Sequence, residues 1–519
     1  MAVMLLCVAV YGKNKPAERK DNVSLLLDYI HGAWDRLNSV NMPYERIVFD
    51  LKMKAGSPLS LYVPHYESAD RVKREVLDRT KTPVIINITV LPTDTENFYF
   101  EKRGQGLLWV PKQYIATGRP GNEMHGWDSY FILQGLIKEG RTDIARDMVD
   151  NLIYEINNYG KVLCVNRTYC MDRSVQPFFT RMVLEVYYCT SDKEWLKGAL
   201  MAAKKYYSYW VTGEHFVKQT GLSRYYGAGN GPCVEVNGAI NYYDTVKKFY
   251  HGSMERDKGK SSPYDMGSFY AHAADIKKAK LKAKFYAADR AVRESGFCVS
   301  DRFGPFSAQI LNYNPVCLNT LLYVMEKDLA EMNAIAGLEA ETRAWIGSYL
   351  ARKNKINELM WDEAKGAYCD YDFVRKCRSG YNFITAFYPM WAGIPDRSQA
   401  EKLARNLRIF EREGGLASSD SSVTGSSWDY PFGWAPVQVL VAQALAKYGY
   451  VNDAQRVAVK WCSTVLKEFL KYNFLFEKYY VENAGKTAYD AREGSCWTNA
   501  SFLILLDMAG DRKNITAIK

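Results

Sequence analysis

Two distant segments of the chain share one helical-hairpin pattern, and this repeat constrains the fold more than any other feature. Residues 136–149 and 445–458 each join the end of one helical pattern to the start of the next. In both segments a glycine, Gly140 or Gly449, ends the first helix, and we expect an Asx residue to cap the second. Repeated hairpins of this kind predict a toroid of paired helices with its loops gathered at one end. The alternative is an irregular helical domain.

Helical patterns dominate the chain after about residue 106, whereas the segment before it is mixed. Residues 84–90 form a β-branched run between two prolines, and residues 25–40 have helical spacing. We therefore expect an all-α fold with a small mixed α/β N-terminal extension over residues 1–105 and a helical domain over residues 106–519. Apolar residues recur at helical spacing over 141–159, 176–211, 316–336, 339–361, 398–410, 437–447 and 452–472.

Charge and the start of the chain argue against two classes of partner. The net charge of +10 is spread along the sequence, without a basic run interleaved with aromatics, so we expect no nucleic acid partner. Residues 1–10 are apolar but lack a basic region and a cleavage site, and they are too short to span a bilayer. We expect them to form a fraying terminus or a short strand, and we expect no membrane association.

Cysteine and histidine usage bears on metals and on the cellular compartment. The 11 cysteines form no CxxC pair, and with only six histidines no zinc-ligand spacing appears. An odd number of scattered cysteines is typical of buried free thiols in a reducing compartment. We therefore expect a cytoplasmic protein without a structural metal site.

The segment 427–436 concentrates rings, prolines and a carboxylate. Trp428, Asp429 and Trp434 lie in it together with two further aromatics, two prolines and a glycine. Proline fixes φ and removes a donor, so this mixture favours a rigid loop over a helix or strand. Flat aromatic faces and a carboxylate suit a sugar ring, which stacks its C–H face on aromatics and bonds its hydroxyls to acids. A core-lining loop without a ligand is the alternative.

Three other segments have a similar character. Residues 118–131 form a Gly/Pro loop that ends in Trp127 and Asp128, although Asp128 could simply cap the helix that follows. Residues 166–178 carry two arginines, planar donor groups suited to sugar hydroxyls and carboxylates. Glu477 stands between aromatic residues, where the pKa of a carboxyl can be tuned for acid or base chemistry, although most such residues are merely solvated.

Together these segments resemble the trehalase family of inverting glycosidases. Residues 118–130 match Gly-x-x-x-x-Glu-x-x-x-Trp-Asp-Ser-Tyr, and residues 428–436 match Trp-Asp-x-Pro-x-Gly-Trp-Ala-Pro. Segments at 293–297, 315–322, 477–479 and 497–499 follow in the family's order. The resemblance implies an (α/α)6 barrel that hydrolyses α,α-trehalose, a small-molecule disaccharide, to two glucose molecules without a metal. We expect a monomer that needs no cofactor.

The resemblance also implies roles for individual residues. Glu477 falls on the family's catalytic base, which activates a water molecule while a second carboxyl group, about 6.5–9.5 Å away, protonates the leaving oxygen. Arg119 stands one place away from the position of a family arginine, and Gln176 one place away from that of a family glutamine. The residues placed around the sugars are Arg119, Trp127, Asp128, Asn166, Arg167, Arg173, Gln176, Glu235, Trp428, Asp429 and Trp434.

The family's acid position departs from the pattern. An aspartate normally follows Glu-Ser-Gly-aromatic, but here the residue is Cys298. A thiol, with a pKa of about 8.5, is poorly matched to an acetal oxygen. Asp301 and Glu294 are nearby carboxyl groups that could replace it. Ser427 also stands where the family usually has a glutamine, and Ala488 where it has a glutamate. Two alternatives therefore stand beside the trehalase interpretation: an impaired trehalase-like protein that binds a disaccharide, and an (α/α)6 enzyme for another α-glucoside.

Overall fold

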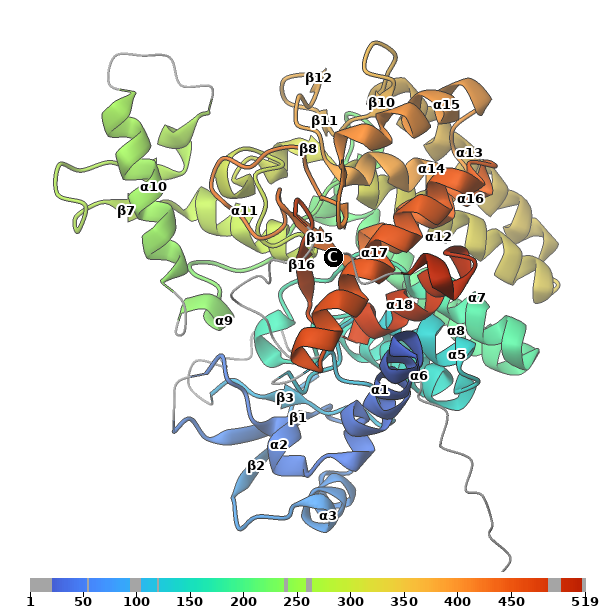
Figure 1. Cartoon of the computed structure of the whole chain (residues 1–519). Coiled ribbons are helices and arrows are strands. Elements are labelled where there is room, and N and C mark those ends of the chain that lie inside the picture. Colours follow the sequence, from blue (N-terminus) through green and yellow to red (C-terminus); the bar gives the residue numbers. More distant parts are fainter. Residues whose placement is uncertain are drawn as a thin grey trace, which may run out of the picture.

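Six helices stand side by side in a closed ring. The computed structural model describes residues 21–53, 56–93, 104–118, 121–237, 241–257, 264–483 and 496–515. Within these ranges each helix of the ring contacts the next, and the last contacts the first (Figure 1). In ring order they are α5 (Asp128–Lys138), α7 (Phe179–Thr190), α12 (Val316–Ile335), α14 (Tyr388–Ala392), α16 (Ala435–Lys447) and α18 (Cys496–Met508).

A second layer of helices surrounds this ring. After each of the first five inner helices the chain returns along the outside, and α1 supplies the sixth outer position by packing against α17 and α18. Paired inner and outer helices of this kind make an (α/α)6 barrel, so the predicted fold class is confirmed. The outer helices are α6 (Thr142–Tyr159), α8 (Lys193–Trp210), α13 (Glu339–Met360), α15 (Arg397–Asn406), α17 (Val451–Tyr472) and α1 (Asn22–Leu37).

Side-chain patterning explains the two layers. The inner helices α12, α16 and α18 bury residues on nearly all sides. The outer helix α17 buries one stripe, which includes Ala454, Val457, Trp461 and Val465. A helix that is apolar all round belongs in a core, whereas a one-sided stripe covers one.

The repeated hairpins end as expected but begin differently. Gly140 and Gly449 have φ values of +74° and +87°, the left-handed conformation that ends a helix. The predicted Asx caps are wrong, because Arg141 and Tyr450 precede α6 and α17 and neither makes a side-chain cap bond. Acidic residues lie instead in each first turn, where they face the positive end of the helix dipole.

The pattern over 176–211 is two helices rather than one. Ser191, with φ of 55°, ends α7 in the left-handed region. Asp192 then caps α8 by accepting a hydrogen bond of 3.0 Å from the amide of Trp195. A short polar turn thus converts one long periodic stretch into an inner–outer pair.

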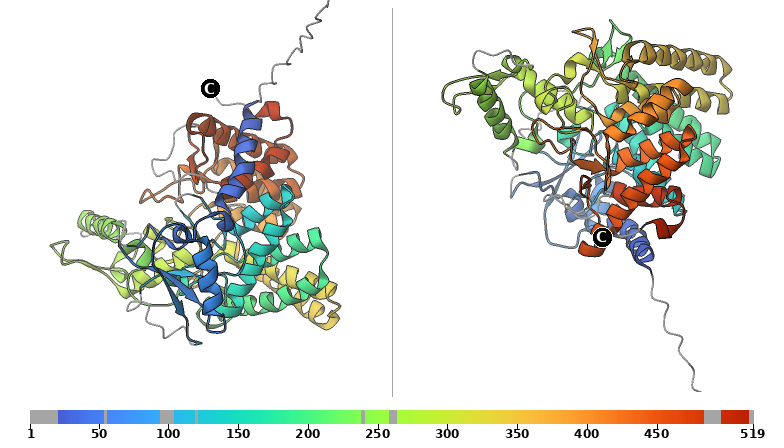
Figure 2. Two further views of the ribbon diagram at one scale, coloured as in Figure 1. Left: turned by 90° about the horizontal axis from the view of Figure 1, so that it is seen from below. Right: turned by 45° about the horizontal axis from the view of Figure 1, so that its top comes forward.

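The N-terminal part contains a small parallel sheet in the order β2-β1-β3. Its strands are β1 (Leu59–Val63), β2 (Ile86–Val90) and β3 (Leu107–Leu108), and α3 (Ala69–Arg79) connects the first two. Both views in Figure 2 show α1 lying along the helical barrel. Strand β3 belongs to this sheet although it follows residue 105 in the chain. The domain boundary at residue 105 therefore stays a prediction. Residues 1–20, including the expected terminal strand, lie outside the described residues.

A lobe projects from one side of the barrel (Figures 1 and 2). It comprises α10 (Tyr242–Arg256), β6 (Tyr270–Ala271), β7 (Lys280–Leu281) and the start of α11 (Ala283–Glu294). Its core is separate from that of the barrel and includes Tyr243, Val246, Tyr250, Phe269 and Phe285. The lobe is therefore a small folding unit inserted between the second and third hairpins.

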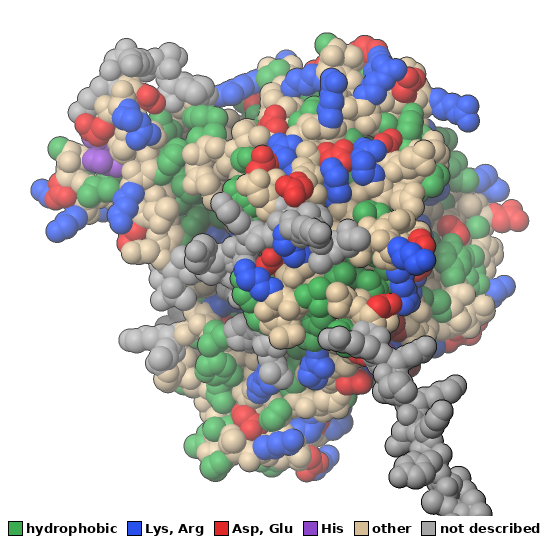
Figure 3. Space-filling view, in the orientation of Figure 1, with side chains coloured by type: hydrophobic (Ala, Val, Ile, Leu, Met, Phe, Trp, Pro, Cys, Tyr) green, Lys and Arg blue, Asp and Glu red, His purple; other side chains and the backbone are tan. Residues whose placement is uncertain are grey.

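Short elements complete the loops around the barrel. On the face seen in Figure 3, acidic and basic side chains are interspersed. No helix in the described ranges is both long enough and apolar enough to cross a bilayer. The remaining α-helices and strands of the described residues are α2 (Tyr44–Val48), α9 (Val234–Asn237), β4 (Phe216–Val217), β5 (Leu222–Ser223), β8 (Tyr313–Asn314), β9 (Trp361–Asp362), β10 (Ala367–Tyr368), β11 (Tyr371–Asp372), β12 (Cys377–Arg378), β13 (Glu411–Arg412), β14 (Gly415–Leu416), β15 (Phe432–Trp434) and β16 (Lys478–Tyr480).

Candidate active site

Three tryptophans from two distant loops stack in a row. The rings of Trp428 and Trp434 are parallel within 5°, with centroids 3.9 Å apart. Trp127 also stacks on Trp428, with centroids 5.4 Å apart and an interplanar angle of 22°. Phe297 and Trp497 pack edge-on against this row. The structure thus brings the predicted aromatic residues together as one wall, which we call the tryptophan wall (Trp127, Trp428 and Trp434).

A two-stranded ladder places Glu477 beside this wall. Strand β15 pairs antiparallel with β16, so that Trp434 is opposite Lys478, the residue that follows Glu477. The indole Nε1 of Trp497 donates a hydrogen bond of 3.2 Å to the carbonyl oxygen of Glu477. The Glu477 side chain is half-buried. The backbone on both sides of this carboxylate is therefore held by residues of the aromatic cluster.

Asp128 lies close to Glu477 at the first residue of α5. The N-cap residue of α5 is Trp127, and Asp128 follows it inside the helix, so the capping alternative is wrong. Burial raises the pKa of the Asp128 carboxyl well above its usual range, and the nearby negative charge of Glu477 raises it further. Two carboxyl groups that repel one another's charge favour a state with one proton between them, and such a pair can bind a hydroxyl-rich ligand as donor and acceptor.

A buried ion-pair cluster contains Arg173 and Glu235. The Arg173 guanidinium bonds to the Glu235 carboxylate and, at 2.8 Å, to Asp172. Arg293 of α11 approaches the same Glu235 oxygen to 3.9 Å and bonds to Asp289. Buried charges require such partners. Arg293 belongs to a segment that resembles the family, but no role could be assigned to it from the sequence alone.

Cys298 lies near this cluster. Its thiol is half-buried, and burial raises the pKa to about 11, against the lowering effect of the Arg293 and Arg173 charges. The sulfur is 3.9 Å from the carbonyl oxygen of Gly296, a long contact for a thiol donor. The group therefore keeps its proton at neutral pH and is a weak acid.

The two carboxylates proposed as substitutes for the missing acid are both engaged. Asp301 is buried and accepts hydrogen bonds from the amides of Val423 and Thr424 at 2.7 and 2.8 Å, and from the Thr424 hydroxyl at 2.7 Å. Glu294 is buried and accepts from Tyr209 at 2.6 Å and from His215 at 3.0 Å. Both carboxyl groups are therefore committed to hydrogen bonds within the protein.

The side chains of three further predicted site residues form hydrogen bonds with neighbouring loops of the protein. Asn166 bonds to the backbone of Met124 and Leu108. The Arg167 guanidinium donates to the carbonyl oxygens that end α2 and to Glu123. Gln176 donates to the carbonyl of Ser295 at 2.8 Å and accepts from Tyr388 at 3.1 Å. They hold the loops of the site in place. Arg119 and Ala488 lie outside the described residues.

Several buried polar atoms of the site have no partner within the described part of the chain. They come from the tryptophan wall, from the ion-pair cluster and from the carboxylate that follows Trp428. Each would normally be hydrogen-bonded, so they suit a ligand that is rich in hydroxyl groups. These atoms are Trp127 Nε1, Arg173 Nε, Glu235 Oε2 and Asp429 Oδ1.

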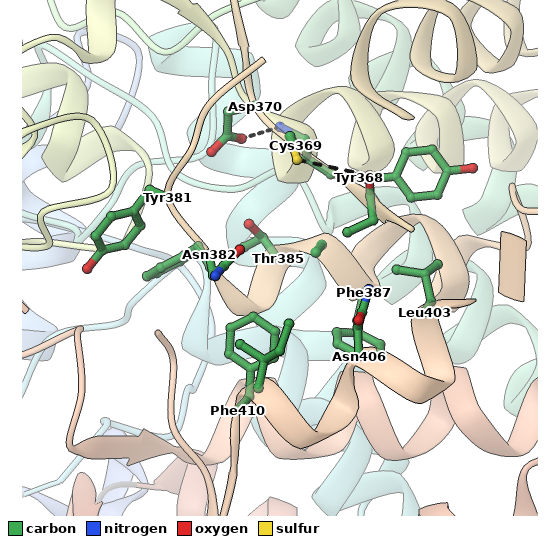
Figure 4. Close-up of a pocket in the computed structure, with 15 residues that line it drawn as sticks. Tyr368, Cys369, Asp370, Tyr381, Asn382, Thr385, Phe387, Leu403, Asn406 and Phe410 are labelled. Carbon is green, nitrogen blue, oxygen red and sulfur yellow. Dashed lines mark hydrogen bonds between the residues drawn. The ribbon is translucent and has the colours of Figure 1, made fainter. Parts of the chain in front are cut away.

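A neighbouring cavity is too small for a sugar. It has a volume of about 20 Å³ and is lined by residues that include Asp370, Tyr381, Thr385 and Phe410 (Figure 4). Asp370 is also the ion-pair partner of the buried Arg302, at 2.7 Å from Nε. A water molecule needs about 10–15 Å³. The cavity therefore has room for about one water and is distinct from the tryptophan wall.

Comparisons with known proteins agree with this arrangement. A model of the trehalase family matches residues 92–510. Cytosolic neutral trehalases of Kluyveromyces lactis and Saccharomyces cerevisiae are 32% and 34% identical to this chain, over 90% and 85% of its length. The chain belongs to the trehalase family. A solved structure of neutral trehalase from Saccharomyces cerevisiae matches 96% of this chain and 95% of its own, with a TM-score of 0.79 and 29% identity.

The chain matches only part of its curated relatives, and its fold also occurs in a more distant hydrolase. The chain spans 68% and 62% of the two curated proteins named above, and 54% of a probable trehalase of Saccharomyces cerevisiae. A mannosylglycerate hydrolase of Thermus thermophilus shares the fold over 76% of this chain and 95% of its own, with a TM-score of 0.52 and 16% identity. The likeness to this mannosylglycerate hydrolase concerns the fold alone.

Proposed function

We propose that this chain hydrolyses α,α-trehalose to two glucose molecules with inversion, and that Glu477 is the catalytic base. The observation that carries the proposal is the β15–β16 pairing, which holds Glu477 against the tryptophan wall. The similarity to cytosolic neutral trehalases supports the same substrate and a cytosolic location. In this reaction Glu477 takes a proton from water, and the oxygen of that water attacks the anomeric carbon from the face opposite the leaving glucose.

The remaining site residues fit roles in binding. The tryptophan wall offers an apolar surface to one glucose, and Asp128 and Asp429 offer carboxyl oxygens to its hydroxyls. Arg173 and Glu235 offer a donor and an acceptor at the ion-pair cluster, close to Cys298. The unpartnered atoms Trp127 Nε1, Glu235 Oε2 and Asp429 Oδ1 support this assignment, since sugar hydroxyls could satisfy each of them.

Cys298 stands in the position of the family's acid, and we expect it to make hydrolysis slow. With its pKa raised to about 11, the thiol has little tendency to protonate the glycosidic oxygen. It also reaches less far than an aspartate. Because general acid catalysis contributes about 10²–10⁴-fold, turnover should fall below that of a complete acid–base pair by a factor of this order.

Substitution of the thiol tests the proposal. Cys298→Asp should raise the rate of trehalose hydrolysis by at least about 100-fold, since it restores the acid. Cys298→Asn introduces a side chain of the same shape as aspartate but without an acidic proton, so it should not raise the rate of hydrolysis. Glu477→Gln should abolish whatever activity exists. Unchanged activity in Cys298→Asp would mean that the acid is elsewhere, and unchanged activity in Glu477→Gln would remove the proposed base.

Disaccharide binding without turnover is the second candidate. The engagement of Asp301 and Glu294 favours it, because each of these two carboxyl groups already has hydrogen-bond partners within the protein. Calorimetry with trehalose distinguishes the two functions. Binding without glucose release would support the second candidate, glucose release would support the first, and absence of both would contradict each of them.

A further inference from the structure

Two of the six histidines meet on the surface of the projecting lobe, and neither is among the residues assigned to the sugar site. His251 and Glu255 are four residues apart on α10 and therefore share one face of the helix. His272 directly follows β6. Figure 3 shows histidine at the surface of this lobe, among acidic and basic side chains. Residues from two separate elements thus converge at one point.

The three side chains are already arranged around a common point. One potential ligand atom from each residue lies within 4.8 Å of the other two. His272 Nε2 is 2.7 Å from a Glu255 carboxylate oxygen. The two imidazole rings are stacked, with centroids 4.9 Å apart and an interplanar angle of 9°.

A fourth residue orients one of the imidazoles. The Nδ1 of His251 is 3.2 Å from the hydroxyl of Tyr270, a buried residue of β6. A hydrogen bond from Nδ1–H to this oxygen leaves Nε2 of His251 with its lone pair free. Histidines that bind metals commonly use one ring nitrogen in this way, with the other held by an oxygen acceptor.

We propose that His251, Glu255 and His272 form a binding site for a divalent transition metal of the zinc class. Two imidazole nitrogens and one carboxylate oxygen are a known zinc-ligand set that leaves a fourth position for water. With Zn–N and Zn–O distances of about 2.0–2.2 Å, tetrahedral ligands are roughly 3.4 Å apart, so a shift of about 1 Å would close the site. The side chains of His272 and Glu255 are 28% and 38% exposed, which leaves them room to move.

The consequence of metal binding would be a cross-link within the lobe. The metal would join α10 to the segment after β6, on the outside of the lobe's small core. The same helix carries Tyr242 and Tyr243, which donate hydrogen bonds to Asp289 at 3.1 and 2.9 Å, next to the ion-pair cluster. Metal binding should therefore stabilise the lobe, and this inference does not depend on trehalose turnover.

Zinc titration of the whole chain tests the proposal. The exposed Cys189 and Cys377 should first be changed to serine, so that surface thiols do not bind the metal. Calorimetry on chelator-treated protein should then show one equivalent of zinc, and cobalt should give the visible absorption of a tetrahedral site. Tyr270→Phe should weaken zinc binding by about 10-fold, as expected for an outer partner.

Variants of the ligands decide the outcome. His251→Ala and His272→Ala should each weaken zinc binding by more than the 10–100-fold typical of an outer partner. His31→Ala is the matched control, because His31 also lies beside a glutamate, at 3.4 Å from Glu139, and should leave binding unchanged. Circular dichroism checks that each variant folds, and Glu255→Gln offers a milder change. Absence of zinc binding, or binding that survives both histidine variants, would overturn the proposal.

Discussion

The backbone amide of Asp301 donates a hydrogen bond of 2.7 Å to the side chain of Asp429. This bond joins the loop that carries Cys298 to the loop that carries Trp428. The carboxylate of Asp301 in turn accepts hydrogen bonds from Val423 and Thr424. Asp301 and Asp429 therefore form a continuous set of hydrogen bonds between the two loops, and the position of the loop that carries Trp428 depends on both residues.

Replacement of Asp301 should lower stability. Asp301→Asn weakens several charge-assisted hydrogen bonds, each worth about 1.5–3 kcal/mol, so we expect a loss of about 2–4 kcal/mol in the free energy of unfolding. Urea denaturation measures this loss. Asp420→Asn is the control, because Asp420 is exposed on the loop that carries Val423 and Thr424 and accepts a hydrogen bond from Asn382. If Asp301→Asn removed activity without any loss of stability, Asp301 would be the catalytic acid after all.

A methyl group at Gly296 should disturb the tryptophan wall. Gly296 has a φ of +78°, and a Cβ there would lie 2.5 Å from the Trp127 ring. Gly296→Ala should therefore cost about 2 kcal/mol or more through strain and overpacking, and should change the near-UV dichroism of the tryptophans. Gly393→Ala is the matched control, since its φ is +81° but nothing lies within 4 Å. Equal effects of the two changes would show that the contact with Trp127 is unimportant.

The guanidinium of Arg173 should matter for sugar binding beyond its charge. Lysine cannot bond to Asp172 and Glu235 at once with a planar fork. In a Glu477→Gln background, which prevents turnover, Arg173→Lys should weaken trehalose binding by about 10–100-fold in calorimetry, equivalent to one or two hydrogen bonds with charged groups. Arg181→Lys should not, although Arg181 also pairs with a buried aspartate, Asp328. Loss of binding in both variants would point to a general effect on folding.

Glu155 should make stability fall as pH rises. Burial raises its pKa from 4.5 to about 8, and its Oε1 has no partner within the described residues. Between these two values the folded state retains a proton that the unfolded state has lost, so stability should fall by up to about 1.4 kcal/mol per pH unit. In the parent protein the Leu163 amide donates a hydrogen bond of 2.9 Å to Glu155. Glu155→Gln keeps an acceptor for this amide and removes the pH dependence of stability that comes from the carboxyl group.

Thermal unfolding at pH 5 and pH 8 measures the effect. The advantage of Glu155→Gln over the parent protein should grow between these values. Glu194→Gln, at a side chain that is 83% exposed, should show no such trend. A constant difference between Glu155→Gln and the parent would mean that Glu155 titrates normally in the folded state.

Much of the fold could be predicted from local signals. The helical period placed α6, α12, α13, α16 and α17 within two residues of their bounds, because an apolar stripe reflects which face is buried. The caps at Arg141 and Tyr450 could not be predicted in the same way. A cap depends on the backbone conformation of one residue, and acidic residues stabilise a first turn equally well through the helix dipole.

The candidate site was predictable as a set of segments but not in its bonding. The sequence by itself determined the all-α class, the aromatic loops and the presence of a thiol where the family has an acid, since these depend on residues that are neighbours in the chain. Only the tertiary structure decided that Asp301 is engaged, because its partner Thr424 is 123 residues away. Which groups a carboxylate contacts is decided only after folding, which is why no local pattern distinguishes Glu477 from Asp301.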